Sequence, residues 1–106
     1  MTKLVNEKGL VTQEAMEIFK RVGKNTSCEC PSHLVDILDT IQRFTVYQQN
    51  CLSSKPQDEH IHTWLHATSM NLEFLVSNTI MALARLEGLV DENNHFTGDD
   101  ELDGKA

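Results

Sequence analysis

The sequence predicts an all-α protein made of a long antiparallel helical hairpin and a short helix that precedes it. Three observations lead to this prediction. Apolar residues recur at spacings of three and four in three separate segments, which is the period of one helix face. Both prolines stand where a helix begins. Only a few residues join the second and third segments, and so short a connection makes the two helices antiparallel.

The composition is that of a globular chain. Its 106 residues fit one domain, with 40% hydrophobic and 24% charged residues. Uninterrupted apolar runs are far shorter than the roughly 20 residues of a membrane-spanning helix, and the N-terminus lacks the apolar region of a signal peptide. We therefore expect a cytoplasmic protein that does not contact the membrane. In a reducing cytoplasm, Cys28, Cys30 and Cys51 are expected as thiols, metal ligands or core residues.

The net charge of −7 is concentrated at the C-terminus. Residues 91–106 hold six acids and one base, a charge of −5, while residues 1–90 hold ten acids and eight bases, a charge of −2. Phosphate neutralisation supplies most non-specific affinity for nucleic acid, so a body without a basic stripe is not expected to bind it directly. The acidic segment 91–106 contains glycine and no apolar period, and we expect it to be a disordered tail.

Before that tail, the sequence divides into an arm and a helical domain. Residues 1–10 have no sustained period and are expected to form a flexible arm, followed by a helical domain over 11–90. Thr12 is a suitable N-cap for a first helix, and Gly23 suits the position just after its end. Its apolar stripe, at spacings of 4, 3 and 4, consists of Val11, Ala15, Ile18 and Val22. A helix this short is marginal alone and must dock on the others.

The two long helices are delimited by proline and glycine. Pro31 starts the second helix, which runs to about Leu52 and is broken by residues 53–56. Its broad apolar face comprises Leu34, Ile37, Leu38, Ile41, Phe44, Thr45, Gln48, Cys51 and Leu52. The third helix spans about 57–87, and Gly88 closes it. At roughly 1.5 Å per residue it is about 45 Å long, more than the first helix can cover.

Two neighbouring stripes run along the third helix. The heptad stripe, at spacings of 4, 3, 4, 3, 4, 3 and 4, consists of Ile61, Leu65, Thr68, Leu72, Leu75, Thr79, Ala82 and Leu86. The second stripe consists of His62, His66, Ser69, Glu73, Val76, Ile80 and Leu83. The C-terminal half of the helix is apolar on more of its circumference than one partner helix can bury. We therefore predict an interaction surface, completed by the first helix or by a second subunit in a homodimer, at Leu72, Leu75, Val76, Ile80 and Leu83.

A cysteine and histidine cluster precedes and enters the second helix. Cys28, Cys30 and His33 lie within six residues, and zinc prefers such ligands. The helix dipole would stabilise a thiolate there. However, the spacing C-x-C-x2-H is not a paired C-x2-C pattern, and no fourth ligand is evident nearby. The alternative is that these are ordinary loop and surface residues. Zinc is the cofactor that this cluster suggests.

A second cluster contains Glu59, His60, His62 and His66. Glu59 and His62 form an E-x-x-H pair, but a carboxylate-bridged di-iron site needs a second such pair and two more glutamates. We expect a polar, partly buried seam instead. Pairing Cys51 with Ile61 in the hairpin would separate the cysteine cluster from these histidines. The sequence also contains no Ser/His/Asp signature, glycine-rich phosphate loop or H-E-x-x-H motif, so we expect no enzyme activity.

The segment Cys28-Glu29-Cys30-Pro31-Ser32-His33-Leu34 resembles the C-E-C-P-x-H-L run of a helical domain associated with bacterial MerR-family transcription regulators. In that domain the run is followed by a long helical hairpin. Asp58, the run His62-Thr63-Trp64-Leu65-His66 and the run Leu86-Glu87-Gly88 are similar to later landmarks, so the resemblance covers about 28–88. It implies a bacterial regulatory or sensor module that dimerises. This sequence has no room for the DNA-binding domain, which favours regulation through another protein.

Three classes of function follow from these features. The leading expectation is a non-catalytic regulatory or protein-interaction module that acts through a helical dimer or partner surface. The alternative is a metal-responsive sensor that binds zinc at Cys28, Cys30 and His33. The least supported class is an enzyme that uses a metal or a cofactor.

Overall fold

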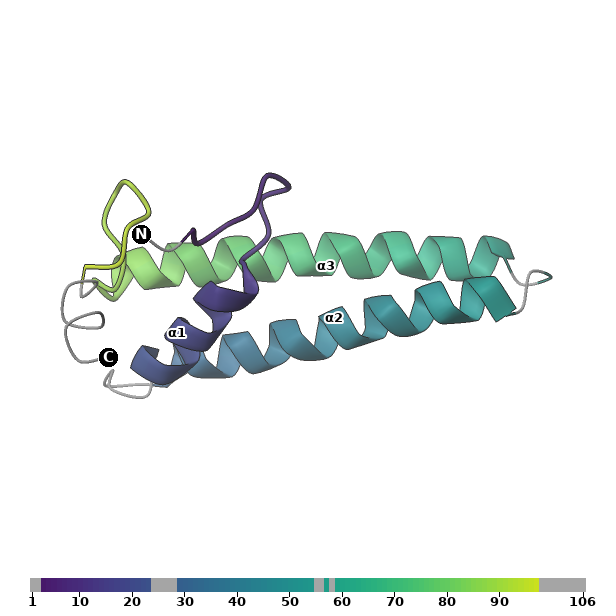
Figure 1. Cartoon of the computed structure of the whole chain (residues 1–106), viewed down its shortest axis with the longest axis horizontal. Coiled ribbons are helices and arrows are strands. Elements are labelled where there is room, and N and C mark those ends of the chain that lie inside the picture. The colour runs from purple at the N-terminus through teal and green to yellow at the C-terminus, as the bar shows by residue number, and fades with distance from the viewer. Residues whose placement is uncertain (1–2, 24–28, 55–56, 58, 98–106) are drawn as a thin grey trace.

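The computed structural model describes residues 3–23, 29–54, 57 and 59–97, and in these residues the only regular elements are three helices. They are α1 (Gln13–Gly23), α2 (Cys30–Ser54) and α3 (Glu59–Leu86). Helices α2 and α3 form a long antiparallel hairpin, and α1 lies against it near the start of α2 (Figure 1). The predicted all-α class is confirmed. None of the helices in the described part of the chain combines the length and apolar character needed to cross a bilayer.

Helix α1 begins at the cap that the sequence predicts. The Ala15 N–H donates to the Thr12 hydroxyl oxygen at 3.1 Å, and the same hydroxyl donates to the Lys3 carbonyl at 2.6 Å. The first bond provides an acceptor for an N–H group of the first helical turn, and the second holds the segment before α1 against the start of the helix. The buried face of α1 contains Ala15, Met16 and Phe19, which join Leu38, Ile80 and Ala84 in the core. Docking on the hairpin is what stabilises a helix of 11 residues.

The residues before α1 belong to the packed structure, which corrects the predicted boundary at residue 11. Leu4 is only 3% exposed, and Val5 pairs with Val11 in an antiparallel bridge. The Asn6 side chain closes the turn between them by accepting hydrogen bonds from two backbone N–H groups. A local turn thus packs Leu4 and Val5 against the helices, although neither residue belongs to an apolar pattern with the period of a helix or a strand.

The residues after α3 are packed in the same way, which corrects the boundary at residue 90. Val90 pairs with Phe96, whose ring meets Phe19 edge-on with the centroids 5.0 Å apart. The Asp91 carboxylate accepts the backbone N–H groups of His95 and Asn93 at 2.9 and 2.8 Å. These bonds, the His95 bond foremost, lower the pKa of Asp91 below its ordinary value. The rest of the predicted tail, 98–106, lies outside the described residues.

Two glycines occupy left-handed backbone positions. Gly88 (φ 76°) ends α3, where its own N–H and that of Leu89 donate to carbonyls of the last turn. Gly9 (φ 81°) lies in the N-terminal turn, and a Cβ atom there would be 3.0 Å from the Phe74 ring of α3. Gly9 therefore permits both the turn and its close approach to α3.

The second stripe, and not the heptad stripe, faces α2. Among its members Ser69, Glu73 and Ile80 are buried, whereas Ile61 and Leu72 of the heptad stripe are exposed. The register is close to the predicted pairing of Cys51 with Ile61, since His62 bonds to Gln48, but the Ile61 side chain itself is exposed. The second stripe faces α2 because its polar groups find partners across the seam, where Glu73 bonds to Thr45 and His62 to Gln48.

Candidate functional site

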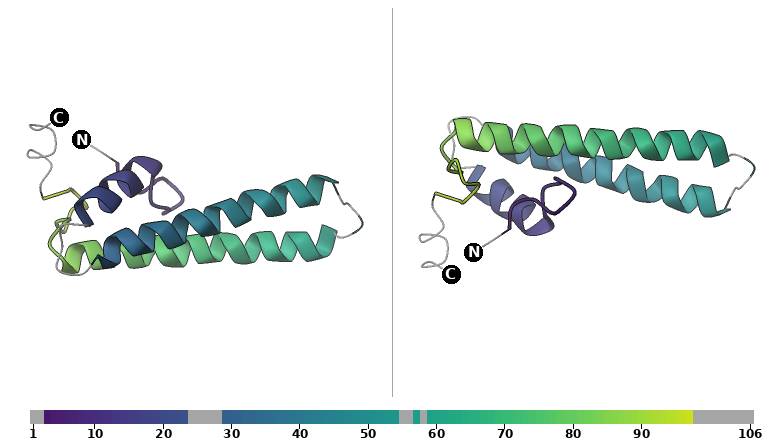
Figure 2. Two further views of the ribbon diagram at one scale, coloured as in Figure 1. Left: turned by 90° about the horizontal axis from the view of Figure 1, so that it is seen from below. Right: turned by 90° about the horizontal axis from the view of Figure 1, so that it is seen from above.

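The side of the hairpin away from α1 carries an uncovered apolar surface. We call it the back face and define it as the heptad stripe of α3 together with Ile37 and Phe44 of α2. Leu65 is half-buried, and the other large side chains of this face have exposed fractions between 41% and 85%: Ile37, Phe44, Ile61, Leu72, Leu75 and Leu86. Figure 2 shows α1 on one side of the hairpin and no described element on the other. This surface is the most extended candidate site in the described part of the chain.

Helical geometry places the back face opposite α1. On α2, Val35 is buried in the core that includes α1, and Ile37 is two residues on, about 200° around the helix. On α3, Ser77 accepts the N–H of Val11 at 3.1 Å, and Leu75 is again about 200° away. The N-terminal segment and α1 therefore cover one side and leave the other bare. At roughly 1.5 Å per residue, α1 spans about 17 Å against about 42 Å for α3.

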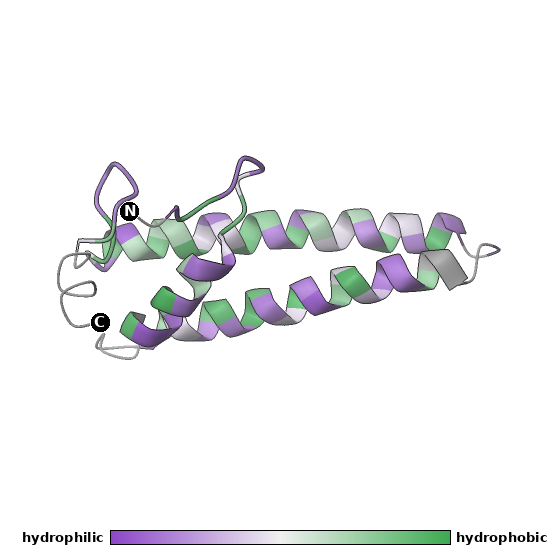
Figure 3. Ribbon diagram, in the orientation of Figure 1, coloured by the Kyte–Doolittle hydropathy of each residue, from purple (hydrophilic) through white to green (hydrophobic). Residues whose placement is uncertain are grey.

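The back face also lacks the charges of an ordinary solvated helix surface. In all of α3 the charged residues are Glu59, Glu73 and Arg85, and none belongs to the heptad stripe. Glu73 is buried in the seam. Apolar residues recur along the full length of both hairpin helices and not only next to α1 (Figure 3). A helix surface this long with so little charge is typical of one that binds a partner.

Beneath the back face, polar side chains join α2 to α3. The Thr45 hydroxyl lies 2.7 Å from a Glu73 carboxylate oxygen, to which it donates. His62 Nδ1 lies 2.8 Å from the Gln48 side-chain oxygen, and His66 Nε2 lies 3.1 Å from the Gln49 amide nitrogen. No buried side-chain polar atom of the described residues lacks a hydrogen-bond partner. These groups hold the hairpin in register, which agrees with the polar seam expected from the sequence.

The predicted E-x-x-H pair does not form a site. Glu59 is exposed at the start of α3, whereas His62 is half-buried and bonded to Gln48. Within the described ranges, no group of three or more His, Cys, Asp or Glu side chains is arranged to hold a metal ion. Of these groups, Glu73, His62 and His66 bond across the seam to α2 instead.

The predicted zinc cluster is described only in part, because Cys28 lies outside the described residues. Cys30 and His33 are both exposed in the first turn of α2. Cys51 lies 21 residues further along the same helix, roughly 30 Å away, and therefore cannot be the missing fourth ligand within one chain. A hydrogen bond with the Cys51 side chain raises the pKa of Tyr47, with smaller contributions from the Cys51 charge and from burial.

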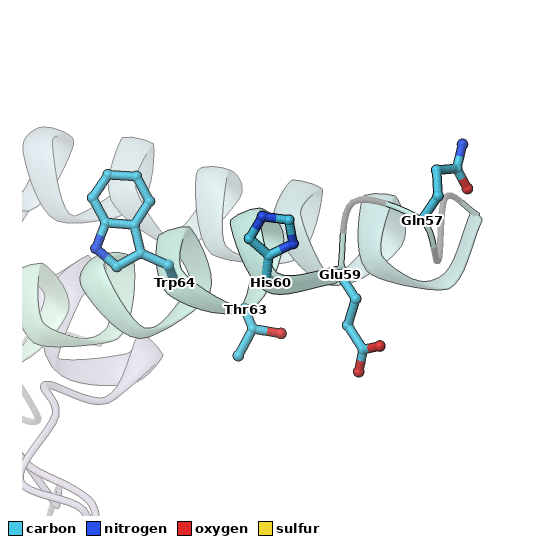
Figure 4. Close-up of a pocket in the computed structure, with 5 residues that line it drawn as sticks. All are labelled: Gln57, Glu59, His60, Thr63 and Trp64. Atoms are coloured by element: carbon cyan, nitrogen blue, oxygen red, sulfur yellow. The ribbon is translucent and has the colours of Figure 1, made fainter.

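A shallow hollow of about 580 Å³ lies at the start of α3. Figure 4 shows its lining, in which His60 and Trp64 point to one side of the helix and Glu59 and Thr63 to the other. All the lining residues come from one short stretch, with Gln57 completing the set. Side chains that diverge from a single helix cannot enclose a small molecule, so this hollow is not a candidate binding pocket.

The predicted interaction residues are divided between the surface and the core. Leu72 and Leu75 are exposed, but Ile80 is only 1% exposed and packs inside the chain. Val76 and Leu83 are half-buried beside the seam. Ile80 is therefore removed from the predicted surface. Ile37 and Phe44 are surface residues that were expected only as part of the broad apolar face of the second helix, and their spacing of seven places them on one side of it.

No protein-family model, no curated protein and no solved structure matches this chain.

Proposed function

We propose that this chain is a non-catalytic regulatory or protein-interaction module of the bacterial cytoplasm that acts through its back face. The observation that carries the proposal is the exposure of six large apolar side chains on one side of a hairpin, four of them along the uncharged heptad stripe. Exposing such a surface to water is unfavourable by roughly 25 cal/mol per Å² of apolar area, so covering it with a partner stabilises the complex. Scattered surface leucines would not require a partner, but a continuous stripe does.

The other features of the chain agree with this proposal. The titratable groups of the seam bond to a threonine and two glutamines of α2, so they do not converge on a substrate. The resemblance of residues 28–88 to a helical domain of MerR-family regulators leads to the same class of function. Because residues 1–90 carry a net charge of −2, regulation by contacting a protein is favoured over direct binding to DNA.

Site-specific photo-crosslinking tests the proposal. A photoreactive phenylalanine analogue placed at Leu75 in cells of the native host should form covalent adducts with a protein. The same analogue at Ala67, which is exposed on α3 outside the heptad stripe, is the control and should form none. Equal adducts at the two positions, or none at Leu75, would contradict the proposal.

The second candidate is a metal-responsive sensor that binds zinc through Cys28, Cys30 and His33. The observation that favours it is that Cys30 and His33 are exposed three residues apart, on one side of the first turn of α2. Thiols must deprotonate to bind zinc, so binding should fail as the pH falls and under chelation.

Metal analysis of protein purified without a histidine tag tests this second candidate. It should find about one zinc per chain, or about one per two chains if the site bridges subunits. Cys28→Ser combined with Cys30→Ser should abolish the metal, and Cys51→Ser should not. Metal-free protein, with unchanged thermal unfolding in the double variant, would reject the sensor.

A further inference from the structure

We infer that the partner on the back face is a second copy of this chain, packed antiparallel about a two-fold axis that passes between Leu72 and Leu75. The inference rests on the proposed function, because it names the partner of the same surface. Three properties of the heptad stripe and its neighbours carry it: their period, their symmetry and their flanking side chains.

The period shows that the partner is a helix. The heptad stripe repeats every 3.5 residues over 26 residues, from Ile61 to Leu86. A straight helix drifts by about 20° per heptad relative to such a repeat, so the stripe stays in line only along a partner helix that crosses at about 20°. An irregular partner surface would not require a strict spacing of 3 and 4.

The order of residues along the stripe is nearly the same in both directions. Outward from the midpoint, it runs Leu, Thr, Leu, Ile towards the N-terminus and Leu, Thr, Ala, Leu towards the C-terminus. The antiparallel layers would be Leu72 with Leu75, Thr68 with Thr79, Leu65 with Ala82, and Ile61 with Leu86 of the second copy. In a two-fold contact, residue i meets j while j meets i, so each of these layers occurs twice, and each pairs apolar with apolar side chains or threonine with threonine.

The sizes of the paired side chains favour the antiparallel arrangement. A parallel pair would stack each stripe residue on its own copy, so that Ala82 meets Ala82 and leaves a gap. The antiparallel pair places the larger Leu65 against Ala82 and fills that layer.

The residues that flank the stripe on the side away from α2 are also complementary to themselves. They are Trp64, Asn71, Asn78 and Arg85, all exposed. Antiparallel packing sets Trp64 beside the Arg85 of the second copy, where a guanidinium on an indole face is attractive. It also sets Asn71 beside Asn78, where two amides exchange hydrogen bonds. Arg85 already donates to Asn94, which orients its side chain and leaves further N–H groups for this contact.

The same rotation places α2 over α2 of the second copy and covers Ile37 and Phe44. The result is a four-helix bundle of two hairpins. Each α1 lies on the outside of this bundle, because α1 is on the side of its hairpin opposite the back face (Figure 2). The face that α1 leaves uncovered thus becomes the core of the dimer.

Spin-label distances test the arrangement. In a variant whose native cysteines are replaced by serine, Glu59→Cys carries a nitroxide label 14.5 residues from the midpoint of the stripe. At roughly 1.5 Å per residue, antiparallel packing places the two labels of a dimer about 44 Å apart, whereas parallel packing places them about 10–20 Å apart. A measured distance near 44 Å supports the inference, and a short distance overturns it.

Sedimentation equilibrium tests the choice of partner. Leu72→Glu combined with Leu75→Glu should weaken dimerisation at least about 100-fold, because each change acts twice in a two-fold interface. Thr63→Glu combined with Ala67→Glu, which adds the same charges to exposed positions outside the stripe, should leave it unchanged. Both variants should keep the far-ultraviolet circular dichroism of the parent.

The failure of this inference differs from the failure of the proposed function. A parent chain that stays monomeric at about 100 µM overturns the second copy as the partner. If the photoreactive group at Leu75 then still captures a different protein, the proposed function stands with another partner. If Leu75 captures nothing, the proposed function fails as well.

Discussion

Replacing Ser77 by alanine removes one hydroxyl from a site that water does not reach. Ser77 and Val11 are buried, and the Val11 N–H donates to Ser77 Oγ at 3.1 Å across 66 residues of sequence. The alanine variant leaves that N–H buried without an acceptor, which costs about 1–3 kcal/mol of unfolding free energy. The higher helix propensity of alanine offsets at most about 0.5 kcal/mol. The loss falls on the contact that holds the N-terminal segment against α3.

Ser69→Ala is the matched control, because Ser69 is on the same helix and as fully buried as Ser77. Its hydroxyl donates to the His66 carbonyl within α3, so its removal leaves no N–H without an acceptor. Urea unfolding followed by circular dichroism at one protein concentration should show a loss for Ser77→Ala and a change within about 0.5 kcal/mol for Ser69→Ala. Hydrogen exchange at the Val11 amide should quicken in Ser77→Ala alone. Equal stabilities of the two variants, with unchanged Val11 exchange, would refute the reasoning.

Three further predictions concern the turns and the seam. Gly9→Ala should lower the unfolding free energy by more than Gly88→Ala in the same urea assay. Both glycines have positive φ, but only a Cβ atom at Gly9 would meet a side chain. Equal losses in the two variants would be inconsistent with that contact. Thr45→Val should cost about 2 kcal/mol, because a buried carboxylate loses a hydrogen bond, whereas Thr45→Ser should retain most of the stability. The hydrogen bond from the His95 N–H lowers the pKa of Asp91. The bond therefore stabilises the turn fully at pH values above the ordinary pKa of about 3.9, and the turn loosens as the pH falls through the lowered pKa. Nuclear magnetic resonance of the His95 amide should show that loosening in the parent but not in Asp91→Asn, and an identical pH profile in the two would count against it.

Much of the helical architecture follows from interactions within a few residues of sequence. The Thr12 cap, the proline at the start of α2 and Gly88 at the end of α3 act within one turn of the helix, so they set helix ends without help from the rest of the chain. The short link between the long helices makes them antiparallel for the same local reason. The three helices, their order and their approximate ends were therefore predictable.

The ends of the packed domain were less predictable, because they depend on single contacts. Leu4 and Phe96 have no neighbours that repeat at a helical or strand period, and each is buried by a turn that an Asn or Asp side chain closes. Asn6 and Asp91 are the residues in the sequence that indicate these turns. Whether the turned segment then packs depends on the Phe19 ring and the α3 surface that it meets.

The choice of the face that α3 buries was decided only by the tertiary structure. The heptad stripe and the second stripe have the same spacing, and the heptad stripe is the more uniformly apolar, so periodicity and composition do not identify the one facing α2. Glu73 finds the Thr45 hydroxyl across the seam, and His62 finds the Gln48 side chain. Such partners come from distant parts of the sequence and are recognised only after the chain has folded. The sequence by itself determined three helices and a surplus of apolar surface. The packing of the second stripe against α2 decided that the heptad stripe is the part of this surface left uncovered.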